Sequence, residues 1–265
     1  MATPGHTATA FDEELRVLSR MIAEMGGLVE KQVVDAIGAL THRDPEGGRR
    51  VVAADATIDA MQRTIEESAV ETIARRQPVA VDLRQVVGML RIANELERIG
   101  DLAKNIGKRV GEINREQMPR RPMGGVRHMT TLMLGQLRDV LDSFADRDAA
   151  KAVDVWARDQ DVDRLYTSLF RELLTYMMED PGIVTFGVHL VFCTKNIERM
   201  GDHATNIAEA VYYMVQGQAL WQDRPKADVT PQIAAAMSSL LIVSVKLVIL
   251  RRRVAASPES SNLCH

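Results

Sequence analysis

Two short acidic phrases are the part of this chain best suited to chemistry. The first pairs Glu97 with Asp101, and the second pairs Glu198 with Asp202, an offset of 101 positions (198 minus 97). Both phrases read Glu-Arg-x-Gly-Asp and are followed in register by Ala and Asn. A spacing of four places both carboxylates on one side of a helix, where like charges repel by roughly a few tenths of a kcal/mol. A bound multivalent cation would offset this repulsion, so the pattern predicts cation binding.

A further pair of acids precedes each phrase. These acids are also spaced by four: Asp55 and Asp59 in the first half, and Asp159 and Asp163 in the second, an offset of 104 (159 minus 55). Pro78 and Pro181 mark a break between the two acidic pairs of each half. The same order of motifs in both halves indicates a duplicated structural unit.

Eight carboxylates are therefore the candidate metal ligands: Asp55, Asp59, Glu97, Asp101, Asp159, Asp163, Glu198 and Asp202. Hard oxygen donors without thiolates or paired histidines favour magnesium, manganese, calcium or iron over zinc or copper. If Leu96 and Ile99 are taken as core positions of a heptad, Glu97 and Asp101 fall on the side away from the core. We expect all eight acids on the outer side of two neighbouring helices in each unit.

The glycines inside both phrases are unusual for a helix. Gly100 and Gly201 each cost about 1 kcal/mol relative to alanine, and they would let a neighbouring helix or a metal approach closely. The alternative is a solvated helix face on which the acids pair with nearby cations, namely Arg98, Lys104 and Lys108.

Composition excludes several classes of protein. The chain has 265 residues, of which 46% are hydrophobic and 26% charged, as in ordinary soluble domains. A net charge of -3 gives no reason to expect nucleic acid as a partner. Two cysteines, Cys193 and Cys264, exclude a disulfide scaffold, and Cys193 is expected in the core. The start of the chain lacks a signal-peptide pattern, so we expect a cytoplasmic protein.

Apolar residues recur at spacings of three and four along most of the chain, which predicts long helices and an all-α fold. The predicted organisation is two tandem pseudo-symmetric three-helix bundles with a tail: bundle 1–115, connector 116–125, bundle 126–218 and tail 219–265, with an apolar segment at 233–250. At about 1.5 Å per residue, that segment is marginal for crossing a bilayer core of about 30 Å. We expect an additional helix there, with contact at the membrane surface as the alternative.

For a histidine in the second acidic phrase and for three arginines near the first interhelical turn, the sequence supports less specific predictions. His203 follows Asp202, but its counterpart in the first half is Leu102, so the repeat predicts a surface histidine and not a ligand. Three arginines flank the first interhelical turn: Arg75, Arg76 and Arg84. A solvated turn is expected there, and an anion or an acidic partner is the alternative.

Taken together, these motifs resemble the PhoU family of phosphate-uptake regulators. The resemblance runs from Phe11 to about Gln218 and is carried by four stretches: 74–78, 82–84, 97–101 and 196–206. It implies two pseudo-symmetric three-helix bundles. It also implies metal ions or multinuclear iron clusters at the E(D)xxxD motifs, which here are the same eight acids.

The resemblance also implies a function. A member of this family is a negative regulator of the phosphate-starvation response and of phosphate uptake. It acts as an adaptor between the ATPase of a phosphate-specific ABC transporter and a sensor histidine kinase, and it is cytoplasmic, membrane-peripheral and often a homodimer. The segment 233–265 has no counterpart in this pattern.

Two other functions compete with this interpretation. A carboxylate-bridged di-iron oxidase needs Glu-x-x-His pairs in a four-helix core, and the sequence contains none. A metal-binding helical scaffold unrelated to phosphate signalling needs only the surface acids. No nucleophile–base pair or phosphate-binding glycine loop is evident, so we predict a binding protein and not an enzyme.

Overall fold

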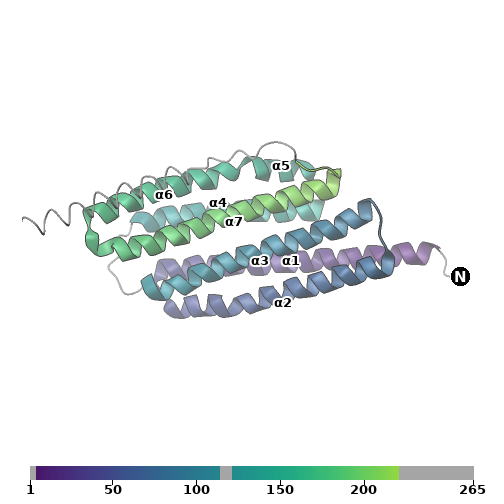
Figure 1. Cartoon of the computed structure of the whole chain (residues 1–265), viewed down its shortest axis with the longest axis horizontal. Helices are drawn as coiled ribbons and strands as arrows, with labels where there is room; N and C mark the ends of the chain where they lie inside the picture. The colour runs from purple at the N-terminus through teal and green to yellow at the C-terminus, as the bar shows by residue number, and fades with distance from the viewer. Residues whose placement is uncertain (1–3, 114–120, 221–265) are drawn as a thin grey trace, which may run out of the picture. The chain divides into compact units, whose positions relative to one another are not determined.

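The structure is a computed structural model that describes residues 4–113 and 121–220. These residues form seven α-helices and one short 3₁₀ helix (Figure 1): α1 (Pro4–His42), α2 (Pro45–Arg76), α3 (Val81–Ile113), α4 (Arg121–Asp146), α5 (Ala149–Ala157), α6 (Asp159–Glu179), η1 (Pro181–Ile183) and α7 (Val184–Gln216). The all-α prediction is confirmed. The apolar segment at 233–250 lies outside the described residues.

The first bundle consists of α1, α2 and α3, each packed against the other two. The first helix carries apolar residues at spacings of three and four, which predict one buried face, and Leu18, Ile22, Met25 and Val29 are all at 1% exposure or less. A sustained stripe of this kind is what holds a long helix in a bundle, because it buries one face along its whole length.

The second bundle consists of α4, the pair α5 and α6, and α7. The spacing of apolar residues from Val155 through Val162, Leu165 and Leu169 to Tyr176 predicts one unbroken middle helix, but the chain is interrupted at Arg158, which has non-helical dihedral angles. The carbonyl oxygen of Arg158 accepts a 2.7 Å hydrogen bond from the buried amide nitrogen of Gln136. No proline or glycine marks this break, so the prediction of one continuous helix was wrong.

One helix end lies where the sequence predicts it, and one lies inside the segment that was expected to be a connector. Helix α2 ends at Gln77, which adopts a left-handed conformation (φ 48°) immediately before Pro78, as the proline predicts. Helix α4 begins at Arg121, inside the segment 116–125 that we expected to be a connector.

In the described residues no helix has both the length and the apolarity needed to cross a membrane.

The two bundles share one hydrophobic core. Helices α3 and α7 run side by side (Figure 1) and pack together more extensively than any other pair of described helices. Gly88 of α3 makes room for this contact, since a β-carbon built on it would lie 2.1 Å from the side chain of Met214. The duplicated units therefore form a single compact body.

Helices α2 and α3 make an equally close contact in the first bundle. A β-carbon on Gly48 would lie 2.7 Å from the carbonyl oxygen of Gly107, and one on Gly107 would lie 2.9 Å from the carbonyl oxygen of Gly48. Both obstacles are backbone atoms, which cannot rotate out of the way. This crossing brings the acidic side of α2 against the acidic side of α3.

The crossing predicts that Gly107→Ala destabilises the protein by about 1–3 kcal/mol, because the added methyl group overpacks two backbones. The measurement is urea unfolding followed by circular dichroism. Gly27→Ala in α1 is the control, since a β-carbon there would meet nothing within 4 Å. It should stabilise the protein by about 1 kcal/mol through helix propensity. A Gly107→Ala variant as stable as the wild type would contradict the close crossing.

Candidate functional site

In the first unit, α2 and α3 bring the four predicted acids together. Burial raises the pKa of the Glu97 carboxyl, and the negative charges of Asp101, Asp59 and Asp55 raise it further, whereas Arg98 lowers it. Electrostatic coupling of this kind requires carboxylates close to one another. We call Asp55, Asp59, Glu97 and Asp101 the first acidic cluster.

The prediction that all eight acids lie on the outer side of the bundles was wrong for two of them. Asp55 is only 3% exposed and Asp159 only 2%, whereas the other six acids are half-buried. The heptad assignment considers one helix alone, but here the outward side of α3 faces a neighbouring helix. Gly100 permits this approach, since a β-carbon on it would lie 3.3 Å from Ile58 of α2.

An ammonium group lies within the first acidic cluster. Nζ of Lys104 donates hydrogen bonds to Oδ2 of Asp55 at 2.5 Å and to Oδ1 of Asp101 at 2.8 Å. These bonds, first to Asp101 and then to Asp55, raise the pKa of Lys104, which stays protonated. Arg98 lies further out, 3.5 Å from Glu97. The pairing of acids with Lys104, considered above as an alternative to a metal, is therefore observed.

The matching acids of the second unit lie on α6 and α7. Asp159 lies in the first turn of α6, where a carboxylate is favoured by the helix dipole, and accepts a 2.8 Å hydrogen bond from the hydroxyl of Thr205. Glu198 accepts one from Nζ of Lys195 at 2.7 Å. Asp163 and Asp202 follow one turn later on the same two helices, both half-buried. These four acids are the second acidic cluster.

Each cluster adjoins a buried glutamine that the sequence analysis did not identify. Gln32 and Gln136 are 3% exposed and stand 104 positions apart, the offset of the aspartate pairs (136 minus 32). The amide nitrogen of Gln32 donates to Oδ1 of Asp55 at 3.2 Å. The amide oxygens of both glutamines are buried and have no hydrogen-bond partner in the described structure. The matching offset was the signal that could have found them.

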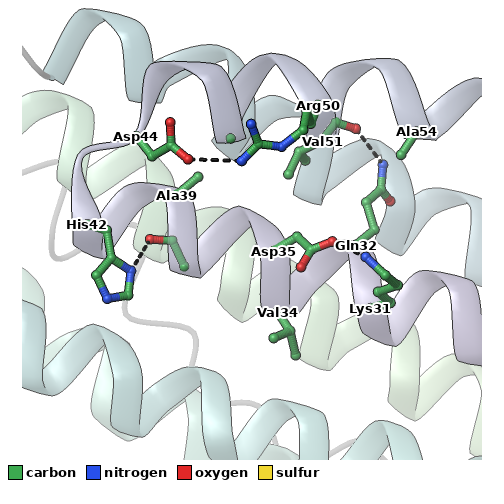
Figure 2. Close-up of a pocket in the computed structure, with 12 residues that line it drawn as sticks. Lys31, Gln32, Val34, Asp35, Ala39, His42, Asp44, Arg50, Val51 and Ala54 are labelled. Carbon is green, nitrogen blue, oxygen red and sulfur yellow. Dashed lines mark hydrogen bonds and ion pairs between the residues drawn. The ribbon is translucent and has the colours of Figure 1, made fainter.

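A pocket between α1 and α2, of about 610 Å³, opens beside Gln32 (Figure 2). Figure 2 shows Lys31 directed at Asp35 and Arg50 directed at Asp44. Because each of these cations is paired with an acid, the pocket does not present the concentrated positive charge that would recognise a phosphate group.

The grouping of the acids decides whether they could hold a metal ion. Over residues 4–113 and 121–220, no three histidine, cysteine, aspartate or glutamate side chains are grouped closely enough to hold one. In the first cluster the Lys104 ammonium bridges Asp55 and Asp101, so these residues do not fit a metal. In the second cluster the equivalent position is Thr205, a neutral hydroxyl. The second cluster has an ammonium at a different position, that of Lys195, which pairs with Glu198.

His203 is not the surface residue that the repeat predicted. Its side chain is 18% exposed, and Nδ1 lies 2.6 Å from Oε2 of Glu95 in α3. The amide nitrogen of Asn206 donates to the same oxygen at 3.0 Å. Together these contacts join α7 to α3 and thus one bundle to the other. A repeat-based argument missed them because the partner lies in the other unit.

The arginines of the first interhelical turn do not converge on one site. Arg76 donates to Glu14 of α1 at 2.8 Å, and Arg75 pairs with Glu71 on its own helix. Arg84 lies instead against the end of α7. The contact of Arg76 with α1 supports the packing of the first bundle.

Comparison with known families agrees with the duplicated architecture. The family model described as "PhoU domain" matches twice, over residues 22–110 and 126–211. The chain belongs to the PhoU family. The resemblance seen in the sequence is thereby confirmed, and the two matched ranges correspond to the two helical bundles.

Individual PhoU proteins match over almost their whole length. The chain is 50% identical over 230 residues to the phosphate-specific transport system accessory protein PhoU homolog of Rhizobium meliloti, covering 87% of this chain and 97% of the relative. It is 45% identical to the homolog of Caulobacter vibrioides, covering 86% and 99%. The crystal structure of PhoU from Pseudomonas aeruginosa matches with a TM-score of 0.75 and 40% identity, covering 78% of this chain and all of that one. PhoU from Streptococcus pneumoniae matches with a TM-score of 0.74, 28% identity, and coverage of 80% and 100%.

The contact between the bundles predicts a dependence of stability on pH. Burial acts to raise the pKa of Glu95, but the bonds from His203 and Asn206 outweigh it and leave this pKa below its ordinary value of 4.5. The stability that Glu95 contributes is therefore complete above pH 4.5 and is lost as the pH falls through the lowered pKa.

We expect Glu95→Gln to lose about 1–3 kcal/mol of unfolding free energy at neutral pH, since hydrogen bonds to a charged group are replaced by neutral ones. The difference between variant and wild type should shrink as the pH falls below 4.5. Urea unfolding at a series of pH values measures both effects. A difference that is the same at every pH would exclude ionised Glu95 as its source.

Proposed function

We propose that this chain is a negative regulator of phosphate uptake and of the phosphate-starvation response. Membership of the PhoU family gives it a role in phosphate transport regulation. The observation that carries the proposal is the 50% identity to a phosphate-specific transport system accessory protein over 97% of that protein's length. The related Streptococcus structure is described as a phosphate transport system regulatory protein, which supports the regulatory part of the proposal.

The proposed mode of action is binding without catalysis. The chain would act as a homodimeric adaptor at the cytoplasmic membrane surface, between the ATPase of a phosphate-specific ABC transporter and a sensor histidine kinase. One observation on nucleophiles supports a non-catalytic role: Cys193 is fully buried, and burial raises the pKa of its thiol to about 12. Such a thiol is inert at neutral pH.

We also propose that the second acidic cluster supplies a site for a hard cation, with iron, manganese or magnesium as the candidates. One feature supports this. A buried amide oxygen of Gln136 adjoins the second cluster, 3.6 Å from the position of a β-carbon on Gly201. Carboxylate and amide oxygens are ligands that these ions prefer.

Deleting the gene should release alkaline phosphatase expression in phosphate-rich medium, because the restraint on the phosphate-starvation response is lost. Re-expression of the wild-type chain from a plasmid is the control and should restore repression. The measurement is phosphatase activity in cells grown with excess phosphate. Tight repression in the deletion strain would contradict the regulatory role.

The adaptor role predicts physical association. The affinity-tagged chain, purified from detergent-solubilised membranes of phosphate-replete cells, should retain the transporter ATPase or the histidine kinase. Mass spectrometry of the purified material identifies them, and an unrelated tagged helical protein serves as the control. Recovery of neither partner, even after chemical cross-linking in cells, would contradict the adaptor role while leaving the phosphatase test unaffected.

A further inference from the structure

We infer that an apolar pocket formed by the start of α3, the end of α4 and the end of α7 binds an acidic peptide segment of a partner protein. One large apolar side chain of the peptide enters the pocket, and the carboxylates beside it contact arginines at the edge. This docking surface serves the adaptor role proposed above, so the inference rests on that role and specifies the chemistry of one segment that the chain recognises.

The pocket has a volume of about 150 Å³ and lies between three helices. Its inner wall consists of side chains that are at most 7% exposed, namely those of Phe144, Val211 and Met214. An apolar cavity of about 150 Å³ accommodates a molecule of the size of benzene. This pocket therefore has room for one Leu, Met or Phe side chain.

The mouth of the pocket is apolar as well. Val81 of α3 and Val215 of α7 line it and are 49% and 38% exposed. Val79 and Leu83, two residues before and after Val81, are also exposed. In Figure 1 the start of α3 and the end of α7 lie at the same end of the body. Apolar residues exposed around a pocket are typical of a protein-binding surface, because association removes them from water.

Arg147, which follows the last residue of α4, supplies positive charge at the edge of the pocket. Its guanidinium donates a 2.9 Å hydrogen bond to the amide oxygen of Gln85, which also lines the pocket. Because Gln85 is neutral, this bond does not compensate the charge. Within residues 4–113 and 121–220, Arg147 takes part in no ion pair.

A second arginine lies close by. Arg84 directly precedes Gln85, and a β-carbon built on Gly217 would be 2.9 Å from its Cζ. The guanidinium therefore lies at the C-terminal end of α7, where the helix dipole favours a cation but supplies only about half an elementary charge. Nε of Arg84 is buried and has no hydrogen-bond partner in the described structure. Two arginines with little compensating charge make this end of the body attractive to carboxylates.

The pocket and the arginines together specify the ligand. An apolar residue between Asp or Glu residues fills the pocket and pairs with the arginines, and buried apolar anchors of this kind dominate the affinity of protein interfaces. The chain's own segment 221–265 has the wrong charge, since it contains six Lys and Arg residues and three acids. A membrane surface would require a broad apolar helix face rather than a pocket for one side chain.

The test begins with a selection of phage-displayed random dodecapeptides on the immobilised full-length chain. Enriched peptides should carry Leu, Met or Phe flanked by Asp or Glu. The strongest binder is then synthesised with a fluorescein label, and its affinity for the full-length chain is measured by fluorescence anisotropy. Added salt should weaken this binding, because it screens the attraction between carboxylates and arginines.

Two variants of the full-length chain change the features that define the site. Arg147→Gln should weaken peptide binding about tenfold, the effect of losing one hydrogen bond between charged groups. Glutamine is compatible with the left-handed conformation of this position (φ 54°), since Gln77 adopts a similar one (φ 48°). Val215→Asp should weaken binding at least as strongly, because it places a negative charge at the mouth of the pocket.

Each variant has a matched control. Arg43 holds the place of Arg147 in the repeat (147 minus 43 is 104) and has the same left-handed conformation (φ 55°). Val188 is 41% exposed on the same helix as Val215. Arg43→Gln and Val188→Asp should therefore bind the peptide as the wild type does. Circular dichroism of all four variants checks that they are folded.

Two results of these measurements would overturn the inference. One is a selection whose enriched peptides lack acidic residues, or that enriches no peptide. The other is an affinity that stays at the wild-type value in both Arg147→Gln and Val215→Asp. If the transporter ATPase or the kinase still co-purifies from membranes, the adaptor role stands and only this surface is rejected. If neither co-purifies but the peptide binds as described, the adaptor role is rejected and the peptide site stands.

Photo-cross-linking identifies any other occupant. The full-length chain is prepared with Val81→p-benzoylphenylalanine and irradiated with the labelled peptide, with phosphatidylglycerol vesicles, or alone, and the products are mapped by mass spectrometry. A cross-link to the peptide is expected. A cross-link to residues 221–265, to a second copy of the chain or to the lipid that excess peptide does not suppress would assign the pocket to that occupant and overturn the inference.

Discussion

The close approach of helices at glycine residues is the constraint on which the rest of this structure depends. Gly48 and Gly107 let α2 and α3 cross with backbones nearly in contact, and Gly88 lets α7 pack on α3 over the side chain of Met214. Helices held this closely turn surface positions into buried ones. The acids of the first unit therefore lie between α2 and α3, where their charges interact with one another and with the ammonium of Lys104.

A buried carboxylate must be hydrogen-bonded or neutralised, since an isolated charge in the interior is strongly destabilising. The two units meet this requirement with different side chains. Asp55 is held by an ammonium and an amide, from Lys104 and Gln32. Asp159 lies in the first turn of α6 and accepts from the hydroxyl of Thr205. Duplication thus preserved the positions of the acids while the groups that surround them changed.

The sequence predicted the helices well because their signals are local. The apolar stripe from Leu18 to Val29 is buried, and Pro78 ends α2. The break at Arg158 could not be predicted, since it is stabilised by a hydrogen bond from Gln136 in another helix. The local sequence pattern predicts a helix and its ends, but it contains no information about hydrogen bonds donated by side chains of other helices.

In the candidate site, too, the local features could be predicted and the contacts between helices could not. Repeat offsets predicted which acids belong together, and the structure groups the acids of the first unit as expected. Their burial was not predicted, because a heptad assignment contains no information about the neighbouring helix. The role of His203 was missed for a related reason: its partner, Glu95, belongs to the other half of the chain.

The contact between Glu95 and His203 has a mechanical consequence. Glu95 precedes Glu97 by two residues on α3, and His203 directly follows Asp202 on α7. Two residues along a helix correspond to a rotation of about 200°, so α3 turns one side to its groove and nearly the opposite side to the other half of the molecule. Any rotation of α3 about its long axis would therefore displace its acids and its contact with the other half of the molecule at the same time.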